Sequence, residues 1–300
     1  MTATAAPVDT AVVVVPKPHD SLAARILRWV AKAPVHIVLF VLGALWLVPT
    51  LGLFITSLLP ASTAASTGWW KVFGHPSELT WSNYNALFHN QGMINALKTT
   101  AYIAVGNTVI VIIVGSLAGY ALAWLEFPGR DWILVGIIAL LVVPLQMALI
   151  PMFKLYDTFG LFDTVLGIIL FHAAFGLPFA IFLLRNFFAG LPKDILESAR
   201  NDGASEIRIF LRLILPLGLP AIASLGIFQF LWTWNDLIVA LTFGQNTQPI
   251  TVWIFGQLRE FGTSIDVIAP ASFISLVVPL IVFFAFQRYF VQGLLAGSVK

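Results

Sequence analysis

The densest group of charged side chains in this sequence lies in one stretch between two strongly apolar runs. The chain has sixteen basic and fourteen acidic residues. Nine of them fall within 28 residues, and these are Arg185, Lys193, Asp194, Glu197, Arg200, Asp202, Glu206, Arg208 and Arg212. Unpaired charges are costly to bury in an apolar environment, so this stretch must contact water or another protein. It is therefore the first candidate for a functional segment.

The residue types needed for bond-breaking chemistry do not form a catalytic pattern. The chain contains no cysteine, which excludes a disulfide framework and a thiol nucleophile. It has neither HExxH nor GxSxG, and it lacks the GxxxxGK[ST] loop that binds nucleotide phosphates. The five histidines show no ligand spacing, and His172, well inside an apolar run, is expected to pack or hydrogen-bond. We therefore expect no catalytic site, no metal site and no ATPase activity in this chain.

Polar side chains within apolar runs are candidates for a solute pathway, because such groups are rare in membranes and usually functional. The strongest group ends the run FQFLWTWND and comprises Gln229, Trp232, Trp234, Asn235 and Asp236. Aromatic rings beside amide and carboxylate groups suit sugars, which present apolar C–H faces and hydroxyl groups. The alternative is an aromatic belt at the membrane boundary, where tryptophan is common. Asn107 and Gln146 are weaker pathway candidates.

The composition places these residues in a membrane protein. Hydrophobic residues make up 59% of the 300 residues and charged residues only 10%, whereas soluble domains carry about 25% charged residues. A bilayer core requires about 20 apolar residues per helix, and backbone groups in lipid must be satisfied internally. Six runs meet this length, at about 35–59, 99–125, 132–153, 164–184, 213–235 and 267–287. The sequence predicts an all-α integral membrane protein over 35–290, with tails at 1–34 and 291–300.

Small residues and prolines within the runs bear on helix packing. Gly115 and Gly119 form a GxxxG pattern in the second run, which allows a neighbouring helix to approach closely. Five of the runs contain an internal proline, at Pro49, Pro144, Pro178, Pro220 and Pro279. Such breaks fit helices that move during transport, but prolines are also common in ordinary transmembrane helices.

The distribution of basic residues predicts the orientation in the membrane. With the N-terminus in the cytoplasm, twelve Lys and Arg residues fall in cytoplasmic segments and four fall on the opposite side. Cytoplasmic loops carry an excess of Lys and Arg. Both termini and the charged loop 186–214 are therefore expected on the cytoplasmic side.

The charged loop is expected to begin with a short helix. Asp194 followed by Glu197 resembles a capping box with Asp194 as the cap, and the helix would run through Arg200. Gly203 can adopt the left-handed conformation that ends a helix. Ser205 can then cap a second helix.

The second helix has an amphipathic pattern. Apolar residues at i, i+3, i+4 and i+7 predict one buried face, formed by Ile207, Phe210, Leu211 and Ile214. This helix would continue into the fifth run, and the pair of helices could transmit a push from a cytoplasmic partner. The alternative is a loop that only joins two spans and meets lipid headgroups.

The spacing of residues in this loop resembles a motif of a known family. Permeases of ATP-binding-cassette (ABC) importers carry E-A-A, three residues, G, nine residues, I, one residue and L-P at this place. This chain has Glu197-Ser198-Ala199, then Gly203, Leu213 and Leu215-Pro216 at the same spacings, with Ser198 for Ala and Leu213 for Ile. From about residue 35 to 300 it is similar to the MalG-type permeases of carbohydrate importers, notably in TWSNYNALF (80–88), SLAGYALAWLEFPGR (116–130) and QRYFVQGLLAGSVK (287–300).

The resemblance implies the fold and a coupling role. The fold would be the type I ABC importer (MetI/MalG-like) permease fold with six transmembrane helices and a cytoplasmic coupling helix. That helix, at 194–203, would sit in a groove on an ATPase subunit and carry its movement to the spans. The residues implied in coupling are Asp194, Glu197, Ser198, Ala199, Asp202, Gly203, Leu213, Leu215 and Pro216.

The resemblance also implies partners and a location. The chain would join a homologous second permease, two ABC ATPase subunits that bind ATP and Mg²⁺, and an extracytoplasmic sugar-binding protein. It would lie in a bacterial-type plasma (inner) membrane and bind neither a cofactor nor nucleic acid itself. The substrate would be a sugar, disaccharide or glucoside, held largely by the partner permease in the maltose system.

Two other classes of function remain to be weighed. A self-contained secondary transporter or channel would need intramembrane charges for ion coupling, and the runs contain almost none. A membrane-embedded enzyme would need a nucleophile and base or a metal site, which the sequence does not show.

Overall fold

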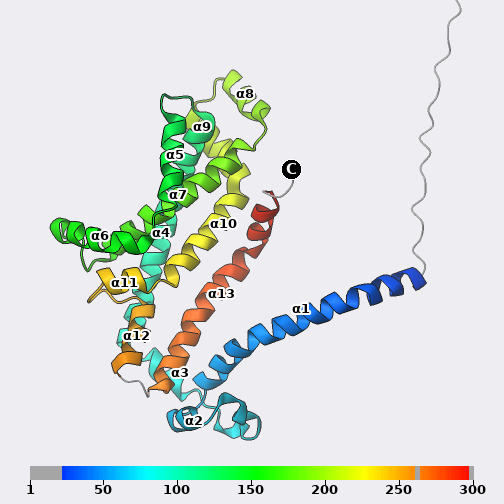
Figure 1. The fold of residues 1–300 in the computed structure, drawn as a ribbon, viewed down its shortest axis with the longest axis vertical. Coiled ribbons are helices and arrows are strands. Elements are labelled where there is room, and N and C mark those ends of the chain that lie inside the picture. Colours follow the sequence, from blue (N-terminus) through cyan, green and yellow to red (C-terminus); the bar gives the residue numbers. More distant parts are fainter. Residues whose placement is uncertain (1–21, 261–263, 297–300) are drawn as a thin grey trace, which may run out of the picture. The chain divides into compact units, whose positions relative to one another are not determined.

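The structure is a computed structural model that describes the backbone of residues 22–260 and 264–296. Every regular element within these ranges is a helix, as Figure 1 shows. The all-α prediction is therefore confirmed. The chain divides into two units, residues 1–51 and residues 52–300. Residues 1–21 and 297–300 of the expected tails lie outside the described residues.

The first helix begins earlier than the sequence analysis predicted. α1 runs from Leu22 to Ser57, and its part from Ala33 to Ser57 is long and apolar enough to cross a membrane. Residues 22–32 were expected to belong to the tail. They are mainly Leu, Ala, Arg and Lys, which have high helix propensity, so the helix extends through them.

The second unit is built on four long helices. These are α4 (Gln91–Trp124), α7 (Val165–Ala189), α10 (Leu215–Trp234) and α13 (Ile265–Ala296). α10 continues α9 (Glu206–Ile209) and the π-helical turn η3 (Phe210–Ile214), so that one helix covers Glu206–Trp234. α10 packs against α4, α7 and α13, as Figure 1 shows.

The predicted third span is not one continuous helix. α5 (Arg130–Leu140) and α6 (Leu145–Phe159) meet at a bend of 100°. Pro144 stands at the N-cap of α6, where it supplies no backbone N–H and disfavours helical geometry in the residue before it. α5 alone rises only about 16 Å, short of a bilayer core of about 30 Å. The pair is therefore either one broken span or a re-entrant segment.

The GxxxG pattern lies at the contact between α4 and α7. A Cβ added at Gly115 would lie 3.0 Å from the Cβ of Ala180, and one at Gly119 would lie 3.1 Å from the backbone N of Arg185. The two helices therefore approach as closely as glycine permits, and the packing prediction is confirmed.

Short helices fill the connections of the second unit. They are α2 (Ala61–Ser66), η1 (Trp69–Phe73), η2 (Pro76–Glu78), α3 (Ser82–Phe88), α8 (Lys193–Asn201), α11 (Ile238–Phe243) and α12 (Ile250–Glu260). The TWSNYNALF segment holds the C-terminal end of α1. Asn83 Nδ2 donates to the carbonyls of Ser57 (3.0 Å) and Leu59 (2.8 Å), and the hydroxyls of Tyr84 and Ser57 lie 2.6 Å apart. The two bonds from Asn83 satisfy carbonyls at and just after the end of the helix, where intrahelical partners are missing.

Candidate functional site

α8 contains the first part of the family-like motif and lies with α9 at one end of the second unit (Figure 1). The predicted capping box is wrong, because Pro192 occupies the N-cap and the helix starts at Lys193. Asp194 therefore lies in the first turn, where its carboxylate is favourable beside the free N–H groups of the helix end. The extended Pro192 explains the shift, since proline suits this boundary but offers no side-chain acceptor.

The C-terminal end of α8 is a Schellman motif centred on Gly203. Gly203 has φ +77°, and its N–H donates to the carbonyl of Arg200 at 2.9 Å. The N–H of Ala204 donates to the carbonyl of Ala199 at 3.0 Å. The two bonds satisfy carbonyls at the end of α8 and turn the chain back towards the bundle. The left-handed conformation predicted for Gly203 is confirmed.

α8 buries one side chain fully against the bundle and exposes most of the others. Leu196 is 1% exposed and belongs to an apolar cluster with Phe188, Ile209 and Ile214. Ala199 packs against the same cluster. The remaining motif residues of α8 and its turn are exposed, namely Asp194, Glu197, Ser198, Asp202 and Gly203. The outer surface of α8 and its turn is thus charged, with the carboxylates of Asp194, Glu197 and Asp202 beside Lys193, and it is available to another chain, while its inner surface packs on the bundle.

The amphipathic face of the second helix differs from the prediction. Phe210 and Ile214 are buried as expected, but Ile207 is 73% exposed and Leu211 is 55% exposed. Ile209 is buried in their place. The buried face is shifted by about one residue. The side chain of Glu206 bonds to Arg200 and Tyr120. Ile209 and Phe210, three and four residues later on the same side of the helix, therefore face the core.

The end of the motif lies where this helix enters the bundle. Leu213 and Leu215 pack against the apolar cluster that holds Leu196. Pro216 lies inside the continuous helix Glu206–Trp234, directly after the π-helical turn Phe210–Ile214. Because proline supplies no N–H for the usual helical bond, a widened turn at this place accommodates it. Ser205 occupies the N-cap of α9, although its side chain makes no capping bond there.

A polar network at this end joins elements that are distant in the sequence. Arg200 Nε lies 2.9 Å from Glu206 Oε1, and Arg200 Nη2 donates to the carbonyl of Trp124 at 3.2 Å. The hydroxyl of Tyr120 donates to Glu206 Oε2. The indole N–H of Trp124 donates to the carbonyl of Phe188 at 3.0 Å. The network connects α8 and α9 with the ends of α4 and α7.

Sequence reasoning missed this network. Tyr120 and Trp124 stand in the segment SLAGYALAWLEFPGR, and Arg200 and Glu206 stand in the charged loop. Their separation of at least 76 residues leaves no local pattern that links them. The only signal is a charged pair in a loop next to an apolar run that ends in Tyr and Trp.

The pathway candidates fall into two groups. The first is buried between α4, α7 and α10, where Asn107 Nδ2 donates to Thr233 Oγ1 at 2.6 Å. Gln229 is also buried there, and His172 Nε2 lies 3.6 Å from Asp236 Oδ2. Among the described residues, Asn107 Oδ1, Gln229 Nε2 and His172 Nε2 have no hydrogen-bond partner. These groups could bind hydroxyl groups or water.

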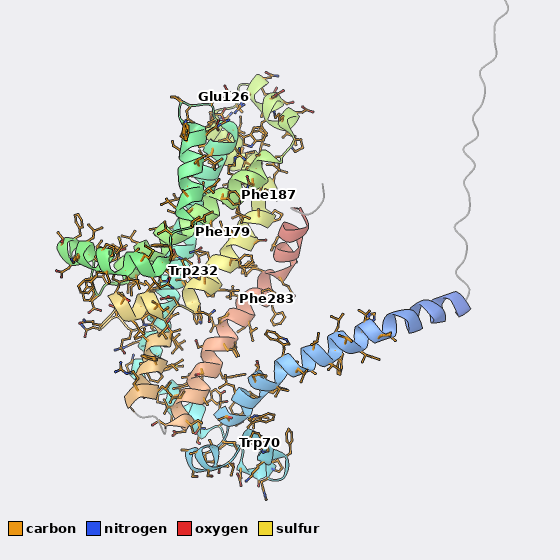
Figure 2. The ribbon with its side chains drawn as sticks, in the orientation of Figure 1. Trp70, Glu126, Phe179, Phe187, Trp232 and Phe283 are labelled. Carbon is orange, nitrogen blue, oxygen red and sulfur yellow. The ribbon has the colours of Figure 1, made fainter. Side chains whose placement is uncertain are left out.

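The other pathway candidates are more scattered. Trp232 is partly exposed near the middle of the second unit, with its ring 5.4 Å from that of His172 (Figure 2). Trp234 is buried, and its indole N–H donates to the carbonyl of Ser275 on α13 at 3.0 Å. The exposed Asn235 bonds back to its own helix. Gln146 is exposed on α6, and no bond or ring contact in the described residues links it to the buried group.

His172 makes the hydrogen bond expected of a packed histidine. Its Nδ1 lies 2.9 Å from the carbonyl oxygen of Ile168, which can only accept, so Nδ1 carries the proton. Nε2 points into a small pocket lined in part by Thr100, Thr233 and Asp236. Within the described residues, no three His, Cys, Asp or Glu side chains are placed to hold a metal ion.

Asp163 fastens the connection after α10 to the turn before α7. Its Oδ1 accepts from the backbone N–H groups of Asn246 (2.8 Å) and Thr247 (2.9 Å), and its Oδ2 accepts from Asn246 Nδ2 at 2.6 Å. Partial burial acts to raise the pKa of Asp163, but these hydrogen bonds outweigh it and hold the pKa below its usual value. Asp163 has φ +57°, unusual for a residue other than glycine.

Comparison with known proteins agrees with this architecture. Residues 111–295 match the family described as "Binding-protein-dependent transport system inner membrane component". The chain is 48% identical over 275 residues to the osmoprotective compounds uptake permease protein GgtD of Synechocystis sp., covering 90% of this chain and 92% of GgtD. It is 50% identical over 233 residues to the alpha-glucoside transport system permease protein AglG of Rhizobium meliloti, covering 75% of this chain and 61% of AglG.

A solved structure shares the fold. It is a crystal structure of a bacterial ABC transporter involved in the import of the acidic polysaccharide alginate, with TM-score 0.71 and 24% identity, and the match covers 91% of this chain and all of that one. Within residues 22–260 and 264–296, five helices are long and apolar enough to cross a membrane, and the bent α5–α6 pair is a sixth candidate. The chain therefore belongs to the family of inner-membrane components of binding-protein-dependent transport systems, as a multi-pass permease of the MalG-like, type I importer fold.

Proposed function

We propose that this chain is one of two transmembrane permease subunits of an ATP-driven sugar importer, coupled to an ATPase subunit through α8. The observation that carries the proposal is the construction of α8. Its charged outer surface is exposed, Leu196 packs its inner surface on the bundle, and Gly203 turns the chain directly into the helix that becomes α10. A short helix held in this way can receive a partner and pass movement on.

The mechanism follows from the rigidity of these connections. When the two ATPase subunits close on ATP and Mg²⁺, the groove that holds α8 moves, and α8 moves with it. α9, η3 and α10 form one helix over Glu206–Trp234, so displacement of α8 tilts or shifts that helix as a body. The permease supplies no group to ATP hydrolysis in this scheme, and the nucleotide and metal belong to the partner subunits.

The substrate class follows from the relatives and from the polar groups on α10. The relatives are named for osmoprotective compounds and alpha-glucosides, and a further relative, 35% identical, is the trehalose transport permease SugB of Mycobacterium tuberculosis. Trp232, Asn235 and Asp236 offer an aromatic face, an amide and a carboxylate close to the surface of the bundle. We infer that the solute is a sugar, disaccharide or glucoside delivered by an extracytoplasmic binding protein.

The test is affinity purification of the tagged chain in mild detergent, with uptake of radiolabelled glucosides and disaccharides measured in the same cells. The wild-type chain should bring with it an ATPase, a second permease and a sugar-binding protein. Gly203→Asp, which adds a charged side chain at the ATPase contact, should abolish uptake without loss of membrane insertion. Gly74→Asp adds the same charge at an exposed glycine of another connection and should leave uptake intact.

Two outcomes would contradict the proposal. Normal uptake in the Gly203→Asp variant would remove the coupling role of α8. Solute movement in vesicles that contain this chain alone, without an ATPase, would instead support a secondary transporter.

A further inference from the structure

The polar network at the end of the bundle joins three helices, α4, α8 and α9, through a few side-chain and backbone atoms. We define the latch as the side chains of Tyr120, Arg200 and Glu206 together with the backbone carbonyl of Trp124. Tyr120 and Trp124 belong to the last turns of α4, Arg200 to the last turn of α8, and Glu206 to the first turn of α9. Figure 2 labels Glu126, just after α4, at the same end as α8.

Glu206 is the centre of the latch. Its two carboxylate oxygens lie 2.9 Å and 3.4 Å from nitrogens of Arg200, and Oε2 also accepts from the hydroxyl of Tyr120. Hydrogen bonds in which a partner is ionised are shorter and stronger than neutral ones, and a bidentate arginine–carboxylate pair also fixes the geometry. Arg200 adds a bond of 3.2 Å to the carbonyl of Trp124, one of the carbonyls that the end of α4 leaves free. The coupling segment is thus bonded to α4 at two points.

The chain itself connects α8 only to α7 and to α10. α7 ends at Ala189, a few residues before α8, and α9 leads directly into α10. α4 is 76 residues away from Arg200 along the chain, so a displacement of α8 reaches α4 only through non-covalent contacts. The apolar cluster that contains Leu196 and Tyr120 provides some of those contacts, and the latch adds two hydrogen-bonded links of defined geometry. α4 in turn packs closely on α7 along Gly115 and Gly119.

We propose that Arg200, Glu206 and Tyr120 are positioning residues that pass the movement of α8 to α4, so that α4, α7 and α10 move together during the transport cycle. The inference rests on the proposed function, since it assumes that α8 is the element an ATPase moves. It adds a second output for that movement. Without the latch, the end of α4 would be linked to α8 only through the apolar cluster and through its packing on α10, which allow the helices to slide past one another.

The solvent exposure of the latch side chains indicates that they contribute little to the stability of the fold. The side chains of Arg200 and Glu206 are 37% and 42% exposed. Ion pairs in such positions contribute little to stability, because water screens them and ordering two long side chains costs entropy. Leu196 and Phe210 already hold α8 and η3 in the apolar cluster. Loss of the latch should therefore leave the protein folded and assembled while it weakens the link to α4.

The first experiment measures ATP hydrolysed per solute transported in the complete complex, reconstituted in proteoliposomes. Glu206→Gln and Tyr120→Phe each remove a latch bond with little change of shape. The phenyl ring of Tyr120→Phe keeps the contact with Phe210, whose ring centroid lies 5.3 Å from that of Tyr120. We expect both variants to hydrolyse ATP and to retain the ATPase, with a several-fold rise in ATP consumed per solute. Glu126→Gln, at an exposed carboxylate at the same end, is the matched control and should keep the wild-type ratio.

The second experiment reads the movement directly. The chain has no cysteine, so spin labels can be placed at Glu126→Cys and Asn201→Cys without removing native thiols. The distance between the ends of α4 and α8 should stay constant through the ATP cycle in the otherwise unchanged chain, and it should change with nucleotide when Glu206→Gln is added. A charge swap, Arg200→Glu with Glu206→Arg, should recover part of the coupling that either single variant loses.

Three results would overturn the proposal. The first is a wild-type ratio of ATP to solute in Glu206→Gln. The second is a spin-label distance between α4 and α8 that behaves the same with and without Glu206→Gln. The third is loss of the ATPase from the purified variant, which would show that the network only holds the assembly together. If the wild-type complex itself contained no ATPase, the proposed function would fail instead, and the two failures are thus distinguished.

Discussion

At the scale of single residues, Gly203 has a left-handed backbone conformation and no neighbouring atoms where a side chain would begin. Its φ of +77° is strained for residues with a side chain, yet a Cβ added there would meet no atom within 4 Å. The requirement for glycine inside this chain is therefore conformational rather than steric. Any further limit on the size or charge of a side chain at position 203 must come from a partner that lies against α8.

This distinction can be tested with two small substitutions. Gly203→Ala should destabilise the end of α8 by about 1 kcal/mol or more, because alanine is strained in the left-handed region, whereas Gly203→Asn should cost less. Uptake rates, corrected for the amount of protein in the membrane, should fall in the order glycine, asparagine, alanine. A rate for alanine above that for asparagine would show that backbone strain is not the limiting factor.

Asp163 predicts a pH dependence of stability. Its hydrogen bonds hold its pKa below the usual value of 3.8, so the folded state favours the ionised form. A group with a lowered pKa contributes stability above its unfolded pKa and loses it as the pH falls through the folded pKa. Asp163→Asn should lower the thermal unfolding temperature at pH 7, and the difference from the wild type should shrink below about pH 4. Thermal unfolding of the purified protein, followed by tryptophan fluorescence, measures this.

The matched control for Asp163 is Asp157, an exposed carboxylate on the neighbouring α6. Asp157→Asn should unfold at nearly the wild-type temperature at every pH. A difference between Asp163→Asn and the wild type that persists unchanged at pH 3 would contradict the role of the ionised carboxylate.

At the scale of the elements, the contact between α4 and α7 depends on the absence of side chains at two positions. Gly119→Val would place methyl groups within the 3.1 Å now separating its Cβ position from the backbone of α7. Overpacking of this kind costs about 1–3 kcal/mol. The thermal stability of the detergent-purified protein should fall accordingly. Gly136→Val, on α5 with nothing within 4 Å of its Cβ position, is the matched control and should unfold like the wild type.

The attachment of α8 gives a second prediction at this scale. Removal of a buried leucine side chain costs about 2–5 kcal/mol, and Leu196 is the only side chain of α8 that is fully buried. Leu196→Ala should loosen α8 and speed tryptic cleavage after Lys193 and Arg200 in detergent. The neighbouring Ile195 is exposed, so Ile195→Ala should be cleaved at the wild-type rate. Equal cleavage rates in both variants would show that α8 is held by other contacts.

At the scale of the whole molecule, the distribution of charge predicts which end of the bundle faces the cytoplasm. The end that carries α8 should lie inside, and the connection that follows α10 should lie outside. Because the chain has no cysteine, single cysteines report this without background. Glu126→Cys and Asn201→Cys should react with a membrane-impermeant maleimide only in inverted vesicles. His75→Cys and Gln245→Cys should react in intact spheroplasts, and the reverse pattern would contradict the orientation.

The site could be found from the sequence wherever its signal is local. The spacing from Glu197 through Gly203 to Pro216 identified the coupling segment, and the left-handed turn at Gly203 followed from glycine chemistry alone. The predicted capping box was wrong because Pro192, two residues before Asp194, occupies the N-cap and sets the helix start. The buried face of the second helix failed because Glu206 is held inward by Arg200 and Tyr120.

The sequence by itself determined the helical class, the apolar runs and the family, because hydrophobic length and fixed motif spacing are properties of consecutive residues. Only the tertiary structure decided that the run 132–153 bends by 100° at Pro144, and that Asn107 and Gln229 are buried inside one bundle. It alone brought Tyr120 to Glu206 across 86 residues. Such pairings depend on how helices pack against one another, and no periodicity along a single helix encodes which distant side chain will complete a hydrogen bond.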